Sequence, residues 1–467
     1  MLALLTLLAP AAHAGGYYFS DIGVRAFSRG GAFVAGADDL TALYYNPAAL
    51  TRLGRGTVTL SVAGVDQAIM FDRLDYPGEG PDGSDLITAP IGNDAPAYAI
   101  PHFGISHTFG LPNTTFAFGF YPPYAPDVAY PSDGPQRYSL VDTLVIQTVT
   151  GPSVAHRVLP WLSVGVGVTW NVLIVEQDLN ITLSNNPDFE QDNYDVAFHM
   201  EGLDMKGFGW NAGVLIEPPD GRFAIGAMVL PPVAFNTTGR MEANFAGNFY
   251  YEEDGLPLIA NETATDEDIA LSVTMPIILK TGALFRPTDN LELEAGFFWE
   301  NWSAVEDLVV TNMDMTIETV EGNSFGIENV EITDDVVLPV GYNDVWSVRL
   351  GGELDIGEKA VVRAGGMYEI AAIPDEALSP SSVDSDKLGV GLGGSWYVLP
   401  GLALDVGLYR AQYFRREIRN SEMMQIAVNP LTGEVSDGRV VGDGDYESSL
   451  LIGGGGLTWQ FGADRGM

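Results

Sequence analysis

Residues 162–175 read L-S-V-G-V-G-V-T-W-N-V-L-I-V, with a large apolar side chain at every second position from Leu162 to Ile174. The intervening positions begin small or polar, as at Gly165 and Gly167. Successive side chains of a β-strand point to opposite faces, so one face of this strand requires an apolar medium and the other requires water or closely packed backbone. The pattern recurs along the chain and favours an all-β fold, a transmembrane antiparallel β-barrel.

The composition of the 467 residues agrees with such a barrel. Hydrophobic residues make up 46% of the chain, charged residues make up 18%, and there are 55 glycines. No run of about 18 apolar residues follows the first dozen positions, which argues against membrane-spanning helices. A barrel reconciles these features, because its apolar residues alternate with others and never form a long run.

The net charge of −40 argues against nucleic-acid binding, which requires a cationic surface. The acidic residues crowd into stretches near 252–268 and 318–335, which we interpret as solvated loops. The absence of cysteine excludes disulfides and thiolate chemistry.

The first 14 residues are typical of a secretory signal peptide. An apolar stretch, Leu2 to Leu8, precedes the small-x-small sequence Ala12-His13-Ala14. No Lys or Arg precedes the apolar stretch, which departs from the usual pattern. The alternative, a short core helix, fits less well because the chain changes character abruptly at Gly15.

Fourteen stretches are candidate strands, and an even number is typical of bacterial single-chain barrels. They are 56–71, 98–110, 114–121, 138–155, 161–176, 199–217, 222–241, 269–286, 289–304, 342–356, 359–371, 385–399, 401–415 and 446–461.

The connections between these strands alternate strictly between short and long. Six are tight and rich in Pro, Gly, Asn and Asp, which favour turns. They lie near 112–113, 159–160, 219–221, 287–290, 357–358 and 400–401. The long ones are 72–97, 122–137, 177–198, 242–268, 305–341, 372–384 and 416–445. This sorting predicts a barrel of the bacterial outer membrane, with short periplasmic turns and long outside loops.

Side-chain chemistry follows the two faces of the strands. The charged residues Arg349, Glu353, Arg363 and Asp405 all fall on the face opposite the large apolar residues, as the cost of charge in hydrocarbon requires. Trp161, Trp170, Trp299 and Trp396 are expected near strand ends, as in interfacial aromatic girdles.

Residues 15–50 do not alternate. Asp38 and Asp39 can cap a short helix from Leu40 to Tyr45, and Pro47 should end it. The segment is too apolar for a free tail, so we expect it to fold into the lumen as a plug, with the barrel formed by 51–467. Small inner residues beside Val164 and Val166 would leave room for it.

Several motifs carry a resemblance to a known family. They include Ser28-Arg29-Gly30-Gly31-Ala32, Ala37-Asp38-Asp39, Tyr44-Tyr45-Asn46-Pro47-Ala48-Ala49-Leu50, Pro135-Gln136-Arg137-Tyr138, Phe285-Arg286-Pro287-Thr288-Asp289-Asn290 and Trp346-Ser347-Val348-Arg349. Together they resemble the FadL family of outer-membrane transporters, which includes the toluene-linked TodX-type members. The first segment is similar to that family's plug, or hatch, with Asn46, Pro47 and Ala48 as its motif.

The resemblance implies passive uptake of hydrophobic molecules, either long-chain fatty acids or aromatic and aliphatic hydrocarbons, with no reaction and no cofactor. It implies capture among the outer loops, a pocket against the hatch, and release through a side opening near a kinked third strand. A chain with about 14 buried methylenes gains on the order of 10 kcal/mol, at about 0.8 each, so sequential sites would release it faster than one deep site.

Candidate ligand contacts are the aromatic residues of the hatch. They are Phe19, Phe27, Phe33, Tyr44 and Tyr45, and packing of the hatch alone explains them equally well. The third strand ends Tyr121-Pro122-Pro123-Tyr124, where proline cannot donate to the ladder. This stretch is either a plain strand end or a lateral gap.

Lys280 and Arg137 are the candidate cations for a ligand carboxylate. Lys280 should point inward, although pairing with acids such as Glu292 or Glu294 is the favoured alternative for either cation. The acidic loops would repel an anionic fatty acid, although salt screens this beyond about 10 Å, and this slightly favours neutral hydrophobes.

Other functions have weaker support. A lipid hydrolase would need a Ser-His pair on the outer wall, for which His102 and Ser106 are candidates, and an adhesive or structural barrel would use the long loops. The histidines show no metal spacing, and a calcium site at Asp443-Gly444-Asp445 is less favoured than a solvated turn. Expected partners are the hydrophobic ligand, outer-membrane lipid and the barrel-assembly machinery, for a monomer.

Overall fold

The computed structural model of the chain describes residues 21–461, apart from residues 75, 80–84, 87–88, 185–189, 191, 253–254, 306–307, 324–325, 333–335, 339–340 and 430–434. The expected signal peptide and the candidate ligand contact Phe19 lie outside the described residues. No helix in the described part of the chain is long and apolar enough to cross a membrane.

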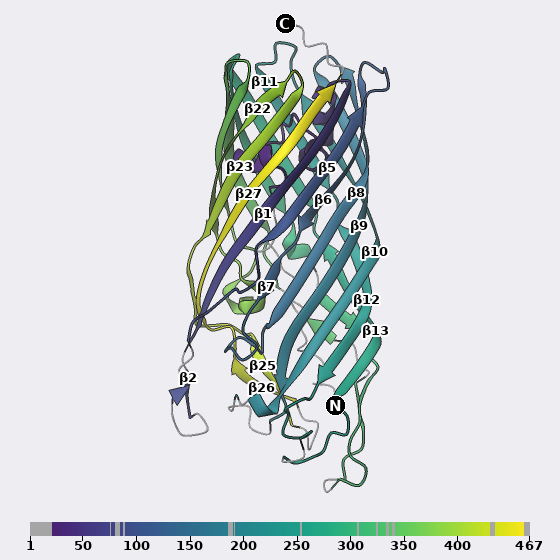
Figure 1. Cartoon of the computed structure of the whole chain (residues 1–467), viewed down its shortest axis with the longest axis vertical. Helices are drawn as coiled ribbons and strands as arrows, with labels where there is room; N and C mark the ends of the chain where they lie inside the picture. The colour runs from purple at the N-terminus through teal and green to yellow at the C-terminus, as the bar shows by residue number, and fades with distance from the viewer. Residues whose placement is uncertain are drawn as a thin grey trace.

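The described residues form a closed antiparallel barrel of fourteen crossings, as the alternation predicts (Figure 1). β11 and β12 share one crossing, as do β13 and β14. The wall strands are β1 (Gly56–Arg73), β5 (Tyr98–His107), β6 (Thr114–Tyr124), β8 (Asp142–Leu159), β9 (Leu162–Thr182), β10 (Asp195–Ile216), β11 (Phe223–Leu230), β12 (Val233–Asn244), β13 (Thr263–Met275), β14 (Ile278–Thr288), β15 (Leu291–Glu300), β20 (Val345–Ile356), β21 (Ala360–Glu369), β22 (Lys387–Leu399), β23 (Leu402–Tyr413) and β27 (Gly444–Phe461). β1 closes the barrel by pairing with β27 from Gly56↔Phe461 to Arg73↔Gly444.

The connections sort as predicted, with short turns at one end and long loops at the other. Gly221, Gly357 and Gly401 occupy short turns with φ of 66°, 64° and 82°, a region that favours glycine. The long loops carry short elements, which are β2 (Tyr76–Glu79), β3 (Asp85–Leu86), β4 (Ile91–Gly92), β7 (Asp127–Ala129), η2 (Asp192–Tyr194), η3 (Trp302–Ala304), β16 (Leu308–Thr311), β17 (Met315–Ile317), β18 (Val330–Ile332), β19 (Val336–Leu338), η4 (Asp375–Ala377), η5 (Pro380–Ser382), β24 (Arg416–Ile418), β25 (Met424–Val428) and β26 (Val435–Val440).

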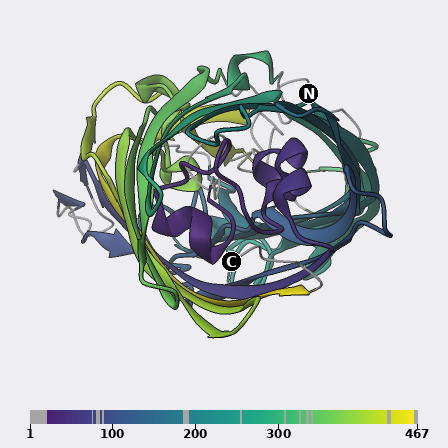
Figure 2. The ribbon, with the colours of Figure 1, turned by 90° about the horizontal axis from the view of Figure 1, so that it is seen from above.

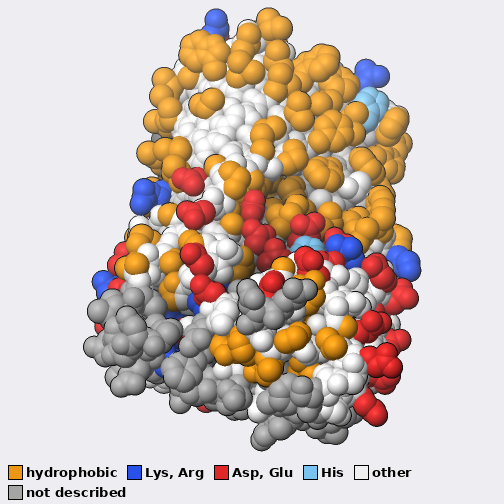
Figure 3. Space-filling view, turned by 60° about the horizontal axis from the view of Figure 1, so that its bottom comes forward, with side chains coloured by type: hydrophobic (Ala, Val, Ile, Leu, Met, Phe, Trp, Pro, Cys, Tyr) orange, Lys and Arg blue, Asp and Glu red, His pale blue; other side chains and the backbone are white. Residues whose placement is uncertain are grey.

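The outer wall is apolar toward the short-turn end, and acidic side chains gather toward the loops (Figure 3). Val164, Val166 and Val168 are exposed on this wall, as the opening stretch predicts. Arg349 and Asp405 are buried on the inner face, which confirms the expected placement of charge. The apolar band is therefore the surface that contacts lipid.

Two details of the strands differ from the sequence-based expectation. β9 extends to Thr182, so Trp170 lies in the interior of the strand rather than near its end, because the ladder continues past the apolar band into the loop layer. The crossings of β11–β12 and β13–β14 were expected to be continuous but are broken at Pro231-Pro232 and at Pro276. Proline lacks the N–H that the ladder needs.

The segment before β1 folds inside the lumen (Figure 2). It contains α1 (Val24–Ser28), α2 (Ala42–Tyr45) and the 3₁₀ helix η1 (Pro47–Arg52). Nearly all of its residues from 21 to 50 are buried. We call residues 21–53 the hatch. Pro47 ends α2 as expected but also begins η1, whose first turn is capped by the Asn46 side chain accepting from the Ala48 N–H.

Candidate functional site

The hatch docks against a belt of glycines on the inner wall. A Cβ added to Gly165 would lie 2.3 Å from the carbonyl carbon of Pro47, and one added to Gly391 would collide with the Phe27 carbonyl oxygen. The belt consists of Gly104, Gly119, Gly165, Gly213, Gly226, Gly282, Gly351, Gly365, Gly391 and Gly407. These small residues let the hatch backbone approach the wall, which confirms the expected reason for glycine beside Val164 and Val166.

The Asn-Pro-Ala motif is one anchor of this contact. Asn46 Nδ2 donates to the carbonyl oxygens of Val34 in the hatch and Val214 in β10, both at 3.1 Å. Its Oδ1 accepts from Ala48 N at 3.1 Å. Both ends of the amide are satisfied, so this side chain ties the hatch to itself and to the wall.

Buried ion pairs form a second set of anchors. The Arg29 guanidinium, fully buried, lies 2.8 Å from Glu292, 3.3 Å from Glu294 and 3.6 Å from Glu353. Arg25 lies 3.0 Å from Asp405 in β23. Glu292 and Glu294 were the expected partners of Lys280, but the structure gives them to Arg29, which is 263 and 265 residues away in the chain.

Asp39 is a titratable group of the hatch itself. Burial raises the pKa of the Asp39 carboxyl to about 6, against the opposing effect of Arg25, and the neighbouring Asp38 carboxylate adds to the rise. The Asp39 carboxylate accepts from both the N–H and the hydroxyl of Thr41, at 2.8 and 2.5 Å.

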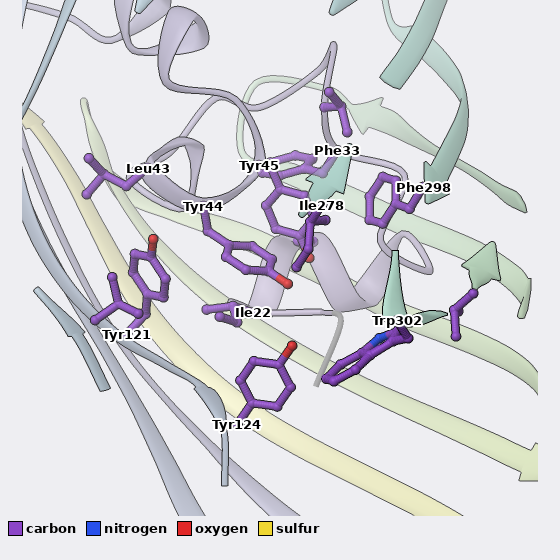
Figure 4. Close-up of a cluster of buried hydrophobic side chains, with 14 of the residues drawn as sticks. Ile22, Phe33, Leu43, Tyr44, Tyr45, Tyr121, Tyr124, Ile278, Phe298 and Trp302 are labelled. Atoms are coloured by element: carbon purple, nitrogen blue, oxygen red, sulfur yellow. The ribbon is translucent and has the colours of Figure 1, made fainter. Parts of the chain in front are cut away.

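Aromatic side chains of the hatch and the wall surround the Lys280 amine. Figure 4 shows the rings of Tyr44, Tyr45 and Phe298 that do so. The Lys280 amine, fully buried on β14, lies 3.0 Å from the centre of the Tyr44 ring and 5.3 Å from that of Phe298. Tyr45 packs edge-on against both Tyr44 and Phe33, with ring centres 5.0 and 5.8 Å apart. The amine has no hydrogen-bond partner among the described residues. Ring faces stabilise a cation, but they accept no strong hydrogen bond. We call Lys280 and the rings around it, Tyr44, Tyr45 and Phe298, the Lys280 pocket.

The kinked third crossing borders the same pocket. The rings of Tyr121 and Tyr44 lie 5.5 Å apart, and Tyr124 packs against Trp302 at 6.4 Å. Pairing of β5 with β6 stops at Phe103↔Phe120, and the register of β6 on β8 shifts between Tyr121 and Tyr124. Pro122 and Pro123, which lie within this shift, are buried. The ladder is therefore weakened where the hatch touches it.

The remaining predicted contacts lie elsewhere. Phe27 packs in a separate cluster with Val24 and Tyr409. Arg137 pairs with Asp195 at 2.7 Å, the alternative that we favoured for it. Sequence reasoning missed Phe298, although its alternation with the exposed Phe297 would have placed it on the inner face.

Two weaker hypotheses do not survive the geometry. His102 and Ser106 share a face of β5, as expected, but it is the inner face, and both are buried, so an outer-wall hydrolase built on them is wrong. The Asp443–Asp445 turn is engaged by protein groups: Asp445 pairs with Arg415 and Arg419 at 2.7 and 2.8 Å. Within the described ranges, no three His, Asp or Glu side chains are grouped to hold a metal ion.

A polar cavity of about 220 Å³ lies beneath the hatch, that is, on the side of the hatch nearer the short turns, beside the β14–β15 turn. Charged side chains line it, including Asp38 and Arg52 of the hatch and Arg286, Glu292 and Glu353 of the wall. An apolar molecule gains nothing from entering such a space.

Fold and hatch define a plugged membrane barrel, and comparison with known proteins is consistent with this class. The sequence profile of the outer membrane protein transport proteins (OMPP1/FadL/TodX) matches residues 5–442. The chain therefore belongs to this family of bacterial outer-membrane transport proteins for hydrophobic compounds, whose members are channels rather than enzymes.

Individual relatives are distant in sequence. The long-chain fatty acid transport protein of Escherichia coli is 22% identical over 213 residues, 45% of this chain and 42% of that protein. Outer membrane protein P1 of Haemophilus influenzae is 24% identical over 210 residues, 43% of this chain and 37% of that protein. The chain thus matches less than half of the length of these two curated relatives.

Solved structures match over nearly the whole fold. A Pseudomonas aeruginosa FadL homologue has a TM-score of 0.75 at 19% identity, covering 96% of this chain and 100% of that one. The Pseudomonas putida toluene transporter TodX has a TM-score of 0.64 at 14% identity, with coverage of 96% and 100%. At these identities the likeness supports the fold alone.

Proposed function

We propose that this protein takes up hydrophobic molecules passively and that its lumen fits a long-chain fatty acid better than a hydrocarbon. The observation that carries the preference is the Lys280 amine, buried among aromatic rings without a hydrogen-bond partner in the described chain. A ligand carboxylate would supply the missing acceptor, while its chain would lie against Tyr44, Tyr45 and Phe298. A hydrocarbon would leave the amine as it is.

The proposed route begins in the loop half of the barrel. A cluster of buried apolar side chains there, including Phe198, Phe245 and Tyr250, would receive the molecule first. It would then reach the Lys280 pocket, where the hatch forms one side. Since the cavity beneath the hatch is charged, we propose exit to the side, where Tyr121 touches Tyr44 and the β5–β6 pairing stops.

The relatives leave both ligand classes open. The Escherichia coli relative is named for long-chain fatty acids, and the Pseudomonas putida structure is that of a toluene transporter. The net charge of −40 still opposes the approach of an anion, so hydrocarbon uptake is the second candidate. We further propose that the protein acts as a monomer in outer-membrane lipid after insertion by the barrel-assembly machinery.

Lys280→Met tests the ligand class. Binding of oleate and of methyl oleate, which has the same chain without the charge, would be measured on purified protein. A hydrogen bond to a charged group contributes about 1.5–3 kcal/mol, so oleate affinity should fall about 10- to 150-fold while methyl oleate affinity stays the same. Lys359→Met, an exposed lysine in the short β20–β21 turn, is the matched control and should change neither. Equal loss for both ligands, or for neither, would contradict a carboxylate site at Lys280.

A further inference from the structure

The wall contains a second interruption, between β10 and the β11–β12 crossing. β11 pairs with β10 from Ala212↔Val229 to Ile216↔Ile225, and β12 pairs with it from Ala197↔Asn244 to Leu203↔Thr238. Residues 204–211 and 230–237 lie opposite each other between these two ladders. All of them are described, and none of the first stretch pairs with any of the second. We call this gap in the ladder the β10–β12 seam. Two crossings, β8 and β9, separate β10 from the β6 kink.

The sequence explains why pairing fails at the seam. Pro231 and Pro232 have no N–H to donate. On the other side, β10 is bulged between Asp204 and Gly207, and the Asp204 carboxylate accepts from Lys206 N at 2.6 Å and from Asn236 N at 2.8 Å. One side chain therefore replaces the backbone carbonyl that would otherwise receive the Asn236 N–H.

Side chains fill the space that the ladder leaves. A Cβ on Gly207 would lie 2.6 Å from the Phe235 ring, and one on Gly209 would lie 2.9 Å from Val233 Cγ2. Phe235 and Val233 thus pack against the β10 backbone at these glycines, and both are buried. Parting a hydrogen-bonded ladder in lipid would leave many N–H and C=O groups unsatisfied, whereas parting the seam requires that the Phe235 ring turn aside and that the single Asn236–Asp204 hydrogen bond open.

The middle of the seam carries apolar side chains on both faces of the wall. Phe208, 72% exposed, and Trp210, 49% exposed, stand on the outer wall beside it. Phe235 belongs on the inner side to the buried apolar cluster that also contains Leu173 and Val175. A slender apolar molecule crossing there would lie against these apolar groups. The polar neighbours of the path are Asp204 and Asn236 at one end of the seam, Asn211 at the other end, and Thr169 and Asn171 behind Gly209.

The depth of the seam assigns it to the outer leaflet. Trp170, beside the end of the seam nearer the long loops, donates from Nε1 to the carbonyl oxygen of Met205 at 2.7 Å. Further toward the loops, the outward-facing residues of β9 include the acidic Glu176. Tryptophans of this kind mark the membrane–water interface. At the end nearer the short turns, Asn211 Nδ2 donates to the hatch carbonyl of Leu43 at 3.0 Å. The seam thus runs from the outer interface down to the hatch.

We propose that the β10–β12 seam is a second lateral passage, through which a single acyl chain enters the lumen from the outer leaflet when the Phe235 ring turns aside. This rests on the proposed uptake of hydrophobic molecules and adds a lipid-side entrance to it. Molecules already dissolved in the membrane would reach the Lys280 pocket without passing the acidic loops.

Photolabelling from the bilayer tests the passage. The probe is a phosphatidylcholine with a diazirine on one acyl chain, mixed into liposomes that hold the full-length protein; it does not leave the membrane. The readout is label on the lumen-facing Leu173 and Val175 relative to label on the lipid-facing Phe208 and Trp210, by mass spectrometry. Phe235→Ala should raise this ratio about tenfold, as expected when closure weakens by about 1.4 kcal/mol.

A disulfide across the seam supplies the opposite test, because the chain has no cysteine of its own. Gly209→Cys with Val233→Cys should lock the seam and reduce the lumen label to background, and a reductant should restore it. Val214→Cys with Ala227→Cys, partners in the intact ladder, is the control and should leave the ratio unchanged. If the locking variant does not fold, Phe235→Ala carries the test alone.

Unchanged ratios in Phe235→Ala and in the locked protein would overturn the passage. Failure of the proposed function is seen separately, with diazirine-labelled stearic acid added from water. If wild-type protein captures none of it in the lumen, uptake itself is wrong. If wild-type protein captures it while the lipid probe ignores both seam variants, uptake stands and the second passage does not.

Discussion

Substitution of a single belt glycine should unseat the hatch while leaving the barrel intact. A Cβ on Gly165 would lie 2.3 Å from the carbonyl carbon of Pro47, 2.4 Å from Ala48 N and 2.6 Å from the Pro47 carbonyl oxygen. All three are backbone atoms, so no rotamer change relieves the clash. Carbon atoms pack at about 3.5–4.0 Å, so Gly165→Ala requires the hatch to move by about 1 Å or more.

The expected cost follows from overpacking. An extra methyl group in a packed interior costs about 1–3 kcal/mol, which raises the population of displaced hatch about 5- to 150-fold. The ladder of β9 does not share this cost, because the added methyl group points into the lumen. The wall should therefore fold normally around a loosened hatch.

Gly455→Ala is the matched control. The nearest atom to a Cβ on Gly455 is the carbonyl oxygen of Asp405 at 3.7 Å, an ordinary contact. Alanine loses less backbone entropy than glycine in a strand, by about 0.5–1 kcal/mol, so this variant should be neutral or slightly more stable. The two substitutions are chemically identical and differ only in the face of the wall that they occupy.

Ion conductance across planar bilayers measures hatch displacement directly. Gly165→Ala should leak through a loosened hatch, and Gly455→Ala should match the wild type. The thermal unfolding temperature of the barrel should not fall in either variant. Equal conductance in the two variants would refute the reasoning that the belt exists to seat the hatch.

Two further predictions concern hatch charges. Arg29→Met leaves Glu292, Glu294 and Glu353 without their shared cation, and removing one partner of a buried pair costs about 3–5 kcal/mol, so this variant should conduct more than Gly165→Ala. Arg222→Met, which removes an exposed ion pair with Asp289, is the control and should conduct like the wild type. A wild-type conductance in Arg29→Met would argue against the ion-pair anchor. The pKa of Asp39 in the docked hatch is about 6, above its ordinary value of 3.8, so the charged form of Asp39 opposes docking. Docking should be firmest below about pH 4 and should loosen as the pH rises through 6. Asp39→Asn should remove this part of the conductance–pH profile, and an unchanged profile would show that Asp39 does not control docking.

Alternation and turn-forming residues predicted most of the wall because each depends only on residues that are adjacent in the sequence. All fourteen expected crossings are present, and so is the sorting of short and long connections. The non-alternating segment before β1 is the hatch. Phe33, Tyr44 and Tyr45 lie together in it, and their role as ligand contacts stays a prediction. Phe27 could not be separated from them, since all four are aromatic residues of one buried segment.

Partners distant in the chain were beyond such reading. Glu294 lies on the same inner face as Lys280, yet it belongs to Arg29, because the hatch brings a second cation to that wall. The β10–β12 seam was likewise hidden: alternation tells which way a side chain points, not whether its backbone is paired. Only the prolines at 231 and 232 hinted at it, and without a neighbour assigned to them they indicate nothing about the wall.

The pairing of β1 with β27 has a consequence for assembly. The hatch is joined to the barrel through the start of β1, and β1 is also the strand that closes the ring against the last one. The hatch contacts strands from β1 to β27, so its binding surface is complete only when the whole wall is in place. A chain that stalls before β27 therefore lacks both a sealed cylinder and the complete binding surface of its plug.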